Sequence, residues 1–464
     1  MEIKEIEILH SKKNMASYGF GKFFDEFLKI AFGTFVFFYY ESELGLNVWI
    51  TALGYIIFAI WNAFNDPFIG YLIDRPFKFT KKWGRRFPWV FIGGIPWIIS
   101  YFLIFNPPSV DPQNGAWILF TWLVITTCIF DTFASLFNVS FYSIFPDKFR
   151  SDKERRKASG ISTLVGTFGV ALGAIIPPLF IKFGNLQSYI IAAGVVMMAC
   201  ALALSLAIPG CREDKERVVS FLIKYEKGLE RESFYKTLKT SLKQKNFVVF
   251  IIMYVFYQSM ASLLGASIPY LVRYVYRLEA SAVALVMVGF LLGSIISIPL
   301  WMFIAQKTNN NRKTIRSAAI AITLFTAPLF FIEDYFILII ATTLWGIGLG
   351  GFWVMLGPIF ADVIDESVVE TGKREEGIYN GILTFFARTS IIIQAITIAI
   401  VHTLTGFVEG AETQSATAIV GIRIHFGLIP MIFMLISTIV LWKYYDLTPV
   451  KVKAIKEKLS QIGL

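Results

Sequence analysis

The chain has 464 residues, of which 56% are hydrophobic and 16% are charged, whereas an ordinary soluble domain has about 25% charged residues. This composition excludes a soluble globular protein. A membrane-spanning helix needs about 20 mainly apolar residues, so twelve of them take about 240 residues and leave the rest for loops and termini. Uncharged runs are spread over the whole sequence, which excludes a receptor with one span and an outer-membrane barrel, whose strands alternate polar and apolar residues.

Apolar runs between charged breaks predict twelve spanning helices. In chain order we expect them at 18–40, 46–73, 88–106, 115–146, 158–183, 187–209, 245–276, 281–305, 314–332, 334–363, 376–406 and 420–445. The expected fold class is therefore an all-α integral membrane protein with twelve transmembrane helices in two six-helix halves.

Lysine and arginine are distributed very unevenly between the loops. Six of them lie in loop 74–87 and six in loop 147–157, whereas the alternate loops 41–45, 107–114, 333–334 and 407–419 contain none. Basic residues near span ends are retained on the cytoplasmic side, so we expect both termini in the cytoplasm and the protein in the plasma membrane. The same sidedness explains the net charge of +10, and no nucleic-acid partner is expected.

The longest polar stretch divides the spans six and six. We expect an N-terminal half at 1–209, a cytoplasmic linker at 210–246, and a C-terminal half with a short cytoplasmic tail at 247–464. Within the linker, residues 218–242 have a helical period and basic side chains, which predicts a helix on the inner membrane surface. Six plus six spans with a central loop is the plan of the major facilitator superfamily, whose two halves rock around a site near mid-membrane.

Four charged residues lie inside span one, where a charge costs about 2.5–3.5 kcal/mol at the membrane centre. Lys22, Asp25, Glu26 and Lys29 are three or four residues apart and therefore lie on adjoining helix faces. One interpretation is a ladder of charges that neutralise each other. The other is that Asp25 or Glu26 faces the central cavity and binds substrate or a proton.

Span two carries one polar stripe on an otherwise apolar helix. Asn62, Asn65 and Asp66 are at i, i+3 and i+4, and no cation on the same helix neutralises Asp66. A carboxylate beside two amide oxygens suits a small hard cation, so we predict that Asp66 binds Na⁺ or a proton. The alternative is a structural polar contact between helices.

Span four also carries polar residues along one face. Asp131, Ser135 and Asn138 are at i, i+4 and i+7 and share one face, which Tyr142 extends. The face is a candidate to line the same cavity as the polar stripe of span two.

The last candidates lie in spans ten and eleven. Thr384 and Arg388 are at i and i+4, and Arg388 is the only cation within its span, which implies a carboxylate or an anionic substrate as its partner. Trp353 follows several glycines that allow close helix approach, and is a candidate to stack on a sugar.

Short motifs in both halves make the chain recognisable. They are YGFG at 18–21, WNAFNDP at 61–67, GYLIDR at 70–75, WGRRFPW at 83–89, ADVID at 361–365 and TGKREEG at 371–377. With these motifs the chain resembles the glycoside–pentoside–hexuronide cation symporter family, the melibiose-permease-like branch of the major facilitator superfamily. The resemblance covers essentially the whole sequence.

The resemblance implies a secondary transporter that carries a sugar or glycoside together with a cation or proton by alternating access, and not an enzyme. It implies cation or proton coupling by Asp66 with Asn62, Asn65 and Asn138, and we expect Asp131 to replace a missing carboxylate by facing the same cavity. It implies substrate binding by Glu26, Tyr142, Trp353, Thr384 and Arg388, to which we add Asp25 from its place beside Glu26. Gating is expected from the basic loop, with Asp74, Arg75, Arg85 and Arg86. Asn62 and Asn138 fall where the family has carboxylates, which leaves the identity of the coupling ion open.

The expected partners are a small-molecule substrate and membrane lipid, the protein is expected to be a monomer, and Na⁺ or H⁺ takes the place of a cofactor. The runner-up substrate is a lysolipid or another anionic amphiphile, because related branches carry lipids and a lone cavity arginine suits a phosphate or carboxylate. A non-transporting sensor or a membrane enzyme is disfavoured, since the sequence has no catalytic constellation of His, Asp and Cys.

Overall fold

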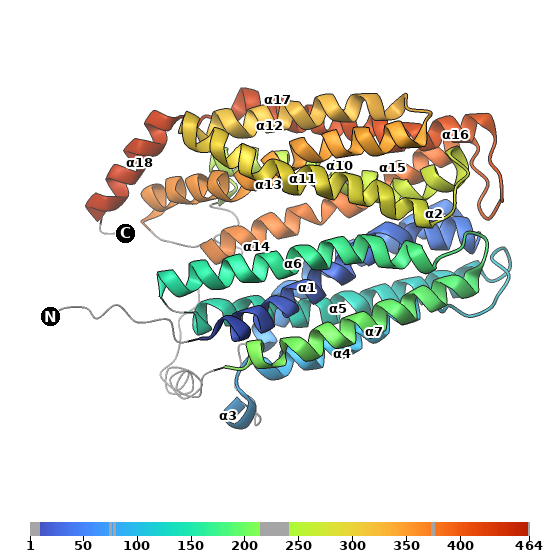
Figure 1. Ribbon diagram of the computed structural model, residues 1–464, viewed down its shortest axis with the longest axis horizontal. Helices are drawn as coiled ribbons and strands as arrows, with labels where there is room; N and C mark the ends of the chain where they lie inside the picture. Colours follow the sequence, from blue (N-terminus) through green and yellow to red (C-terminus); the bar gives the residue numbers. More distant parts are fainter. Residues whose placement is uncertain are drawn as a thin grey trace. The chain divides into compact units, whose positions relative to one another are not determined.

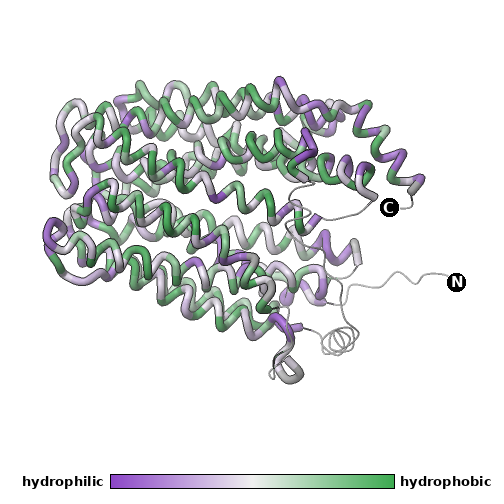
Figure 2. The backbone as a smooth tube through the Cα atoms, turned by 180° about the vertical axis from the view of Figure 1, so that it is seen from behind, coloured by the Kyte–Doolittle hydropathy of each residue, from purple (hydrophilic) through white to green (hydrophobic). Residues whose placement is uncertain are grey.

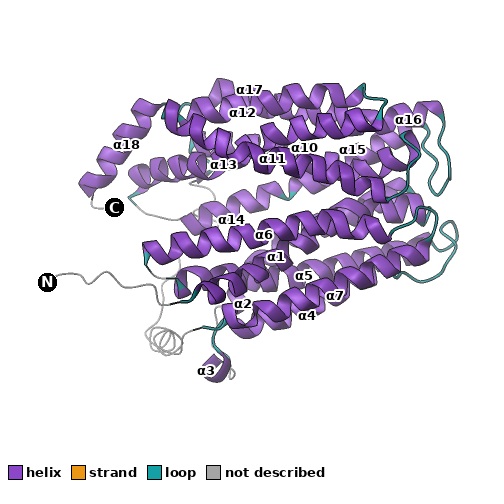
Figure 3. Cartoon of the chain, in the orientation of Figure 1, coloured by secondary structure: helices purple, strands orange, loops and turns teal. Residues whose placement is uncertain are grey.

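The computed structural model describes residues 10–73, 77, 80–149, 151–213, 241–372 and 376–462. All regular secondary structure in these ranges is helical (Figure 3). Ten helices among the described residues are long and apolar enough to cross a membrane. Hydrophobic residues run along the helices, whereas hydrophilic residues gather toward the ends of the helices and in the C-terminal helix (Figure 2). The predicted all-helical membrane fold is confirmed.

The chain divides into two compact units. Unit 1 comprises 1–230, 279–284 and 409–412, and unit 2 comprises 231–278, 285–408 and 413–464. The predicted surface helix of the linker lies almost entirely outside the described residues.

Among the described residues, seven helices and one π-helical turn precede the linker, and α1 packs beside α6 and α7 (Figure 1). They are α1 (Lys12–Phe38), η1 (Tyr39–Glu43), α2 (Val48–Ile73), α3 (Thr80–Trp83), α4 (Phe87–Ile104), α5 (Ala116–Lys148), α6 (Asp152–Phe180) and α7 (Leu186–Cys211).

The described residues after 241 are also helical, and four of the expected spans there, the seventh, ninth, eleventh and twelfth, are not one continuous α-helix. These elements are α10 (Lys245–Tyr270), η2 (Leu271–Val275), α11 (Ser281–Thr308), α12 (Asn311–Thr326), η3 (Ala327–Phe330), α13 (Tyr335–Thr371), α14 (Glu376–Ala387), α15 (Thr389–Thr405), α16 (Ala416–Arg423), η4 (Ile424–Leu428), α17 (Ile429–Tyr444) and α18 (Pro449–Ile462). The eleventh span breaks at Arg388, between α14 and α15, and the twelfth contains the π-helical turn η4.

The first long helix before the linker and the first after it end in the same way. α1 continues into η1 and α10 continues into η2, and both additions are π-helical turns. Two residues after each turn the backbone is left-handed, with φ of 74° at Gly45 and 55° at Arg277. Glycine adopts this conformation freely, whereas for arginine it is unfavourable by about 1–2 kcal/mol. The repeated geometry indicates that the two halves share one local design.

Glycines bring α13 very close to α11. A Cβ at Gly346 would overlap the carbonyl oxygen of Phe290, and one at Gly350 would overlap the carbonyl oxygen of Ser294. Backbone cannot move aside as a flexible side chain can, so only glycine fits at these two positions. This packing fixes the helix that carries Trp353.

We expect Gly346→Ala to lower the thermal stability of the purified protein, because overpacking costs about 1–3 kcal/mol. Gly357→Ala is the matched control on the same helix, since a Cβ there would meet no atom within 4 Å. The control gains up to about 1 kcal/mol of helix propensity. A thermal unfolding curve checks both, and equal midpoints would show that the α11–α13 contact is not tight.

Candidate functional site

The charged segment of α1 is fixed by the packing of α1 against α6. A Cβ at Gly169 would overlap the carbonyl oxygen of Phe23, and a Cβ at Gly173 would lie 2.7 Å from the carbonyl oxygen of Phe27. The rotation of α1 about its axis is thereby set. This contact decides where the four charged side chains of span one point.

Asp25 is 0% exposed and both of its oxygens are engaged. Oδ1 lies 2.6 Å from Nζ of Lys29, one turn along α1. Oδ2 accepts a hydrogen bond of 2.7 Å from the hydroxyl of Tyr142 on α5. The carboxylate of Asp25 therefore joins two helices, which corresponds to the charge-ladder interpretation for this residue.

Glu26 differs from its neighbour. Within the described residues its carboxylate accepts no hydrogen bond and forms no ion pair. Nζ of Lys22, which is close in sequence, donates to Oγ1 of Thr163 on α6 at 3.3 Å. Of the two acids in span one, Glu26 is thus the one whose carboxylate is available to a ligand.

The polar stripe of α2 meets a carboxylate on α5. Nδ2 of Asn62 donates to Oδ1 of Asp131, and Nδ2 of Asn65 donates to Oδ2 of the same residue at 3.2 Å. All three side chains are buried. Two amides therefore hold one carboxylate, which compensates part of the cost of its burial.

A second carboxylate lies in the adjacent turn, where Oγ of Ser135 donates to Oδ1 of Asp66. Ser135 follows Asp131 by one helical turn on α5. We call Asn62, Asn65, Asp66, Asp131 and Ser135 the α2–α5 acid cluster. It contains two carboxylates, whereas span two alone offers only one.

The acid cluster contains an oxygen that suits a cation. Oδ1 of Asn62 is buried and has no hydrogen-bond partner. An amide oxygen and the carboxylates of Asp66 and Asp131 are ligand types that a small hard cation prefers. The residues therefore fit Na⁺, and the carboxylates also fit a proton. No hydrogen bond between described residues joins Asn138 to this cluster, although its own Oδ1 is buried without a partner.

One end of unit 1 is held by the basic loop that was expected to gate transport. Asp74 and Arg75 lie outside the described residues, and Arg85 is partly buried. The guanidinium of Arg86 donates to Oδ2 of Asp147 at 2.6 Å and to a backbone carbonyl of α5. Arg86 therefore ties the start of α4 to the end of α5.

Two further charged residues complete this end and were missed in the sequence. Oε2 of Glu213 accepts from the backbone N–H groups of Arg86 at 2.7 Å and Phe87 at 3.1 Å, which caps the N-terminus of α4. Lys148 is 4% exposed, and its ammonium donates to the carbonyl oxygen of Gly210 at 2.7 Å, at the end of α7. Both interactions complement a helix dipole.

In unit 2 one predicted site residue, Trp353, contacts a tyrosine of α10. Nε1 of Trp353 donates to the hydroxyl of Tyr257 at 2.5 Å, while the indole is 41% exposed. The ring of Tyr257 lies 6.0 Å from that of Tyr254 on the same helix, and Arg388 is partly buried. Thr384 is exposed. The spacing of Tyr254 and Tyr257 at i and i+3 in an apolar span was the available signal for both.

Two histidines that are far apart in sequence also come together. Nε2 of His402 lies 3.1 Å from Nε2 of His425, and Nδ1 of His425 lies 2.7 Å from Oγ of Ser267. Both imidazoles are buried. Within the described ranges, no group of three or more His, Cys, Asp and Glu side chains is placed to hold a metal ion.

Comparison with known proteins agrees with this fold and these motifs. A family model described as MFS/sugar transport protein matches residues 17–448. The isoprimeverose transporter of Lactiplantibacillus pentosus is 22% identical, with 92% of this chain and 88% of the relative covered. The glucuronide carrier protein homolog of Escherichia coli is 23% identical, with 96% of this chain and 94% of the relative covered.

Sodium-dependent lysophosphatidylcholine symporter 1-A of Danio rerio is 20% identical, covering 83% of this chain and 76% of the relative. Among solved structures, the D-xylose-proton symporter superposes with a TM-score of 0.62 at 13% identity. The match covers 95% of this chain and 98% of the symporter chain. At that identity the structure supports the fold alone. The matched family model covers nearly the whole chain, from the first spanning helix to the last. The chain therefore belongs to the MFS/sugar transport protein family, the melibiose-permease-like symporters of the major facilitator superfamily.

Proposed function

We propose that this protein transports a sugar or glycoside in symport with Na⁺ or H⁺ by alternating access. The observation that carries the proposal is the α2–α5 acid cluster, which places two carboxylates on neighbouring turns inside a membrane-spanning unit. The substrate class is supported by relatives named for isoprimeverose, glucuronide and raffinose.

The acid cluster gives a physical reason for coupling. Two carboxylates in a low-dielectric environment repel each other, so loading one of them with a cation or proton is favoured. Asp66, Asp131 and Oδ1 of Asn62 would hold the ion, which supplies positive charge there. Asn62, Asn65 and Ser135 donate hydrogen bonds that keep α2 and α5 in register around it. An ion that binds one state better shifts the equilibrium toward that state.

Each unit offers its own groups for substrate. In unit 1 the carboxylate of Glu26 accepts hydroxyl donors, and Asp25 holds Tyr142 in place. In unit 2 the exposed indole of Trp353 stacks on the apolar face of a sugar, with Tyr257 fixing its orientation. Arg388, with Thr384 one turn before it, hydrogen-bonds ring or hydroxyl oxygens.

The remaining assignments follow from the charge distribution. We place both termini in the cytoplasm, because the basic loops belong on that side. We propose that the protein acts in the plasma membrane, as a monomer. The gating role of loop 74–87 is supported at its end by the Arg86–Asp147 ion pair.

A second candidate substrate is a lysolipid. It is favoured by the relatives named lysophosphatidylcholine symporters in Danio rerio and Gallus gallus. Arg388 suits the phosphate of such a headgroup as well as it suits a sugar hydroxyl.

Counterflow in proteoliposomes separates the two candidates. Vesicles preloaded with raffinose or with methyl glucuronide are expected to take up the same sugar in labelled form. Vesicles that contain lysophosphatidylcholine are not expected to take up labelled lysophosphatidylcholine. Trp353→Phe should reduce sugar exchange about tenfold, because the wider π-face of indole is lost. Trp117→Phe, an exposed tryptophan of α5, is the matched control. Exchange of the lysolipid without exchange of either sugar would establish the second candidate in place of the first.

A further inference from the structure

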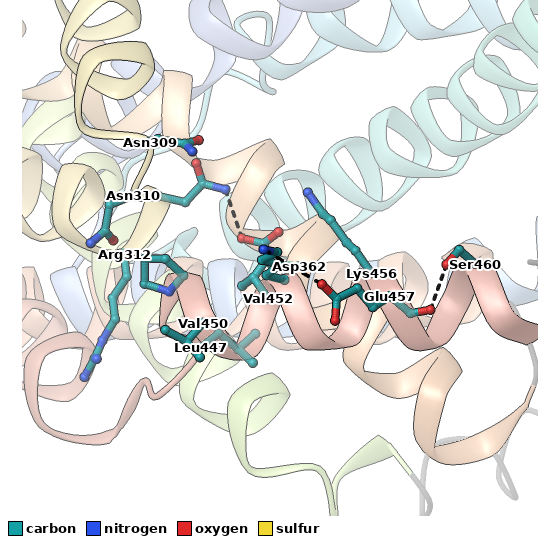
Figure 4. Close-up of a pocket in the computed structure, with 13 residues that line it drawn as sticks. Asn309, Asn310, Arg312, Asp362, Leu447, Val450, Val452, Lys456, Glu457 and Ser460 are labelled. Atoms are coloured by element: carbon teal, nitrogen blue, oxygen red, sulfur yellow. Dashed lines mark hydrogen bonds and ion pairs between the residues drawn. The ribbon is translucent and has the colours of Figure 1, made fainter.

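A cavity of about 610 Å³ lies at the end of unit 2 that carries the C-terminus (Figure 4). Its walls come from the first turn of α12, from α13 and from α18. Arg312, Asp362, Lys453 and Lys456 line it together with three consecutive asparagines, residues 309–311. None of these residues belongs to the transport site described above.

The corresponding place in unit 1 is filled by the protein itself. The sequence IFPD at 144–147 of α5 matches IFAD at 359–362 of α13. Asp147 binds Arg86 at the start of α4, and Asp362 accepts a 2.9 Å hydrogen bond from Nδ2 of Asn311 at the start of α12. In unit 1 the carboxylate of Glu213 then covers the first N–H groups of α4.

Asn310 caps the start of α12, but no carboxylate among the described residues covers its first N–H groups as Glu213 does at α4. Oδ1 of Asn310 accepts from the N–H of Lys313 at 2.9 Å. The N–H groups of Asn311 and Arg312 make no hydrogen bond within the described residues. These two N–H groups, like those that Glu213 covers in unit 1, belong to the helix N-terminus, which attracts negative charge.

The side chains around the cavity have an excess of positive charge. Arg312, Lys453 and Lys456 bring three positive charges, against two negative charges on Asp362 and on Glu457, which lies 4.0 Å from Lys453. Arg312 and Lys456 form neither a hydrogen bond nor an ion pair with the described residues, and Nε of Arg312 is buried without a partner. Lys456 extends from α18 toward the side of the cavity where Asp362 lies (Figure 4). A buried guanidinium nitrogen with no acceptor is costly.

We propose that this cavity binds an anionic group of the phosphate or carboxylate type. Arg312 and Lys456 supply the charge, and the first N–H groups of α12 supply directional donors. The bound anion accepts hydrogen bonds from the first N–H groups of α12, as Glu213 does at α4 in unit 1. It also links α18 to α12. Its source is either a soluble anion or the phosphate of a lipid headgroup.

Thermal unfolding of the purified full-length protein tests the site. In detergent, inorganic phosphate is titrated against chloride at constant ionic strength, and a saturable rise in Tm of about 2 °C is expected. In nanodiscs, phosphatidylglycerol is compared with phosphatidylcholine. A response to free phosphate identifies a soluble source, a response to phosphatidylglycerol alone identifies a lipid source, and either supports the anion site.

The double variant Arg312→Gln, Lys456→Gln should lose the response, whereas Lys458→Gln should keep it, because Lys458 is an exposed lysine of α18 that does not line the cavity. Val450→Glu is a second test, since Val450 lines the cavity and is 79% exposed. The new carboxylate should raise Tm without phosphate and remove the further response. An equal response in wild type and the double variant, or no response to either probe, would overturn the proposal.

Discussion

Asp66→Asn is expected to abolish gradient-driven accumulation of substrate while leaving counterflow measurable. The change keeps the shape of the side chain and removes the negative charge that loads with the coupling ion. Without that charge, ion binding and substrate binding are no longer linked, so the gradient cannot drive uptake. The loss should be about 100-fold or more in the accumulation ratio, since a coupling free energy of about 3 kcal/mol corresponds to about 150-fold.

Two variants show whether the cluster acts as a unit. Asp131→Asn should also uncouple transport, because the carboxylates of Asp131 and Asp66 are both held by hydrogen bonds between α2 and α5. Asn138→Ala is the control on the same helix, since no hydrogen bond between described residues joins Asn138 to the cluster. Uptake of labelled sugar into proteoliposomes under an imposed gradient checks all three. Full accumulation in Asp66→Asn would remove Asp66 from the mechanism.

Glu26→Gln and Asp25→Asn are expected to fail in different ways, although the two residues are adjacent. Glu26 makes no hydrogen bond or ion pair among the described residues, so its loss should weaken substrate binding about tenfold or more and leave stability nearly unchanged. Asp25 is fully buried between Lys29 and Tyr142. Its loss should lower the free energy of unfolding by about 1–3 kcal/mol, because asparagine has one acceptor oxygen in place of two and no negative charge to pair with Lys29.

Substrate titration and thermal unfolding of both variants, in the same detergent, separate the two roles. Tyr142→Phe is the matched control for Asp25→Asn, because it removes only one of the two hydrogen-bonding partners of the carboxylate. If Glu26→Gln binds substrate normally and Asp25→Asn does not, the available carboxylate of span one has been assigned to the wrong residue.

Hydrophobic patterning was sufficient to predict the all-helical membrane fold. Two of the twelve expected spans are not among the ten long apolar helices found in the described residues. The first expected span, within α1, carries four charged residues, and α12 has only 16 residues before η3. The break at Arg388 and the π-helical turns were not predicted, because they depend on local hydrogen bonding that apolar periodicity does not encode.

The site was predictable in its residue types but not in its pairs. The polar stripe of α2 was visible in the sequence, because spacing within one helix is fixed. Its partner Asp131 was only one of several candidates, since the register between two helices is set by their packing. Glu213, Tyr257 and the His402–His425 pair were missed for the same reason: each acts through a residue on another helix.

The most direct test of the central claim is sugar accumulation by the wild-type protein in proteoliposomes. Labelled raffinose or methyl glucuronide is offered under an inward Na⁺ gradient, an inward H⁺ gradient, or neither. We predict accumulation above the external concentration with one of the two gradients, and its collapse when an ionophore dissipates that gradient. Uptake that only reaches the external concentration and ignores both gradients would contradict the account of a cation-coupled symporter.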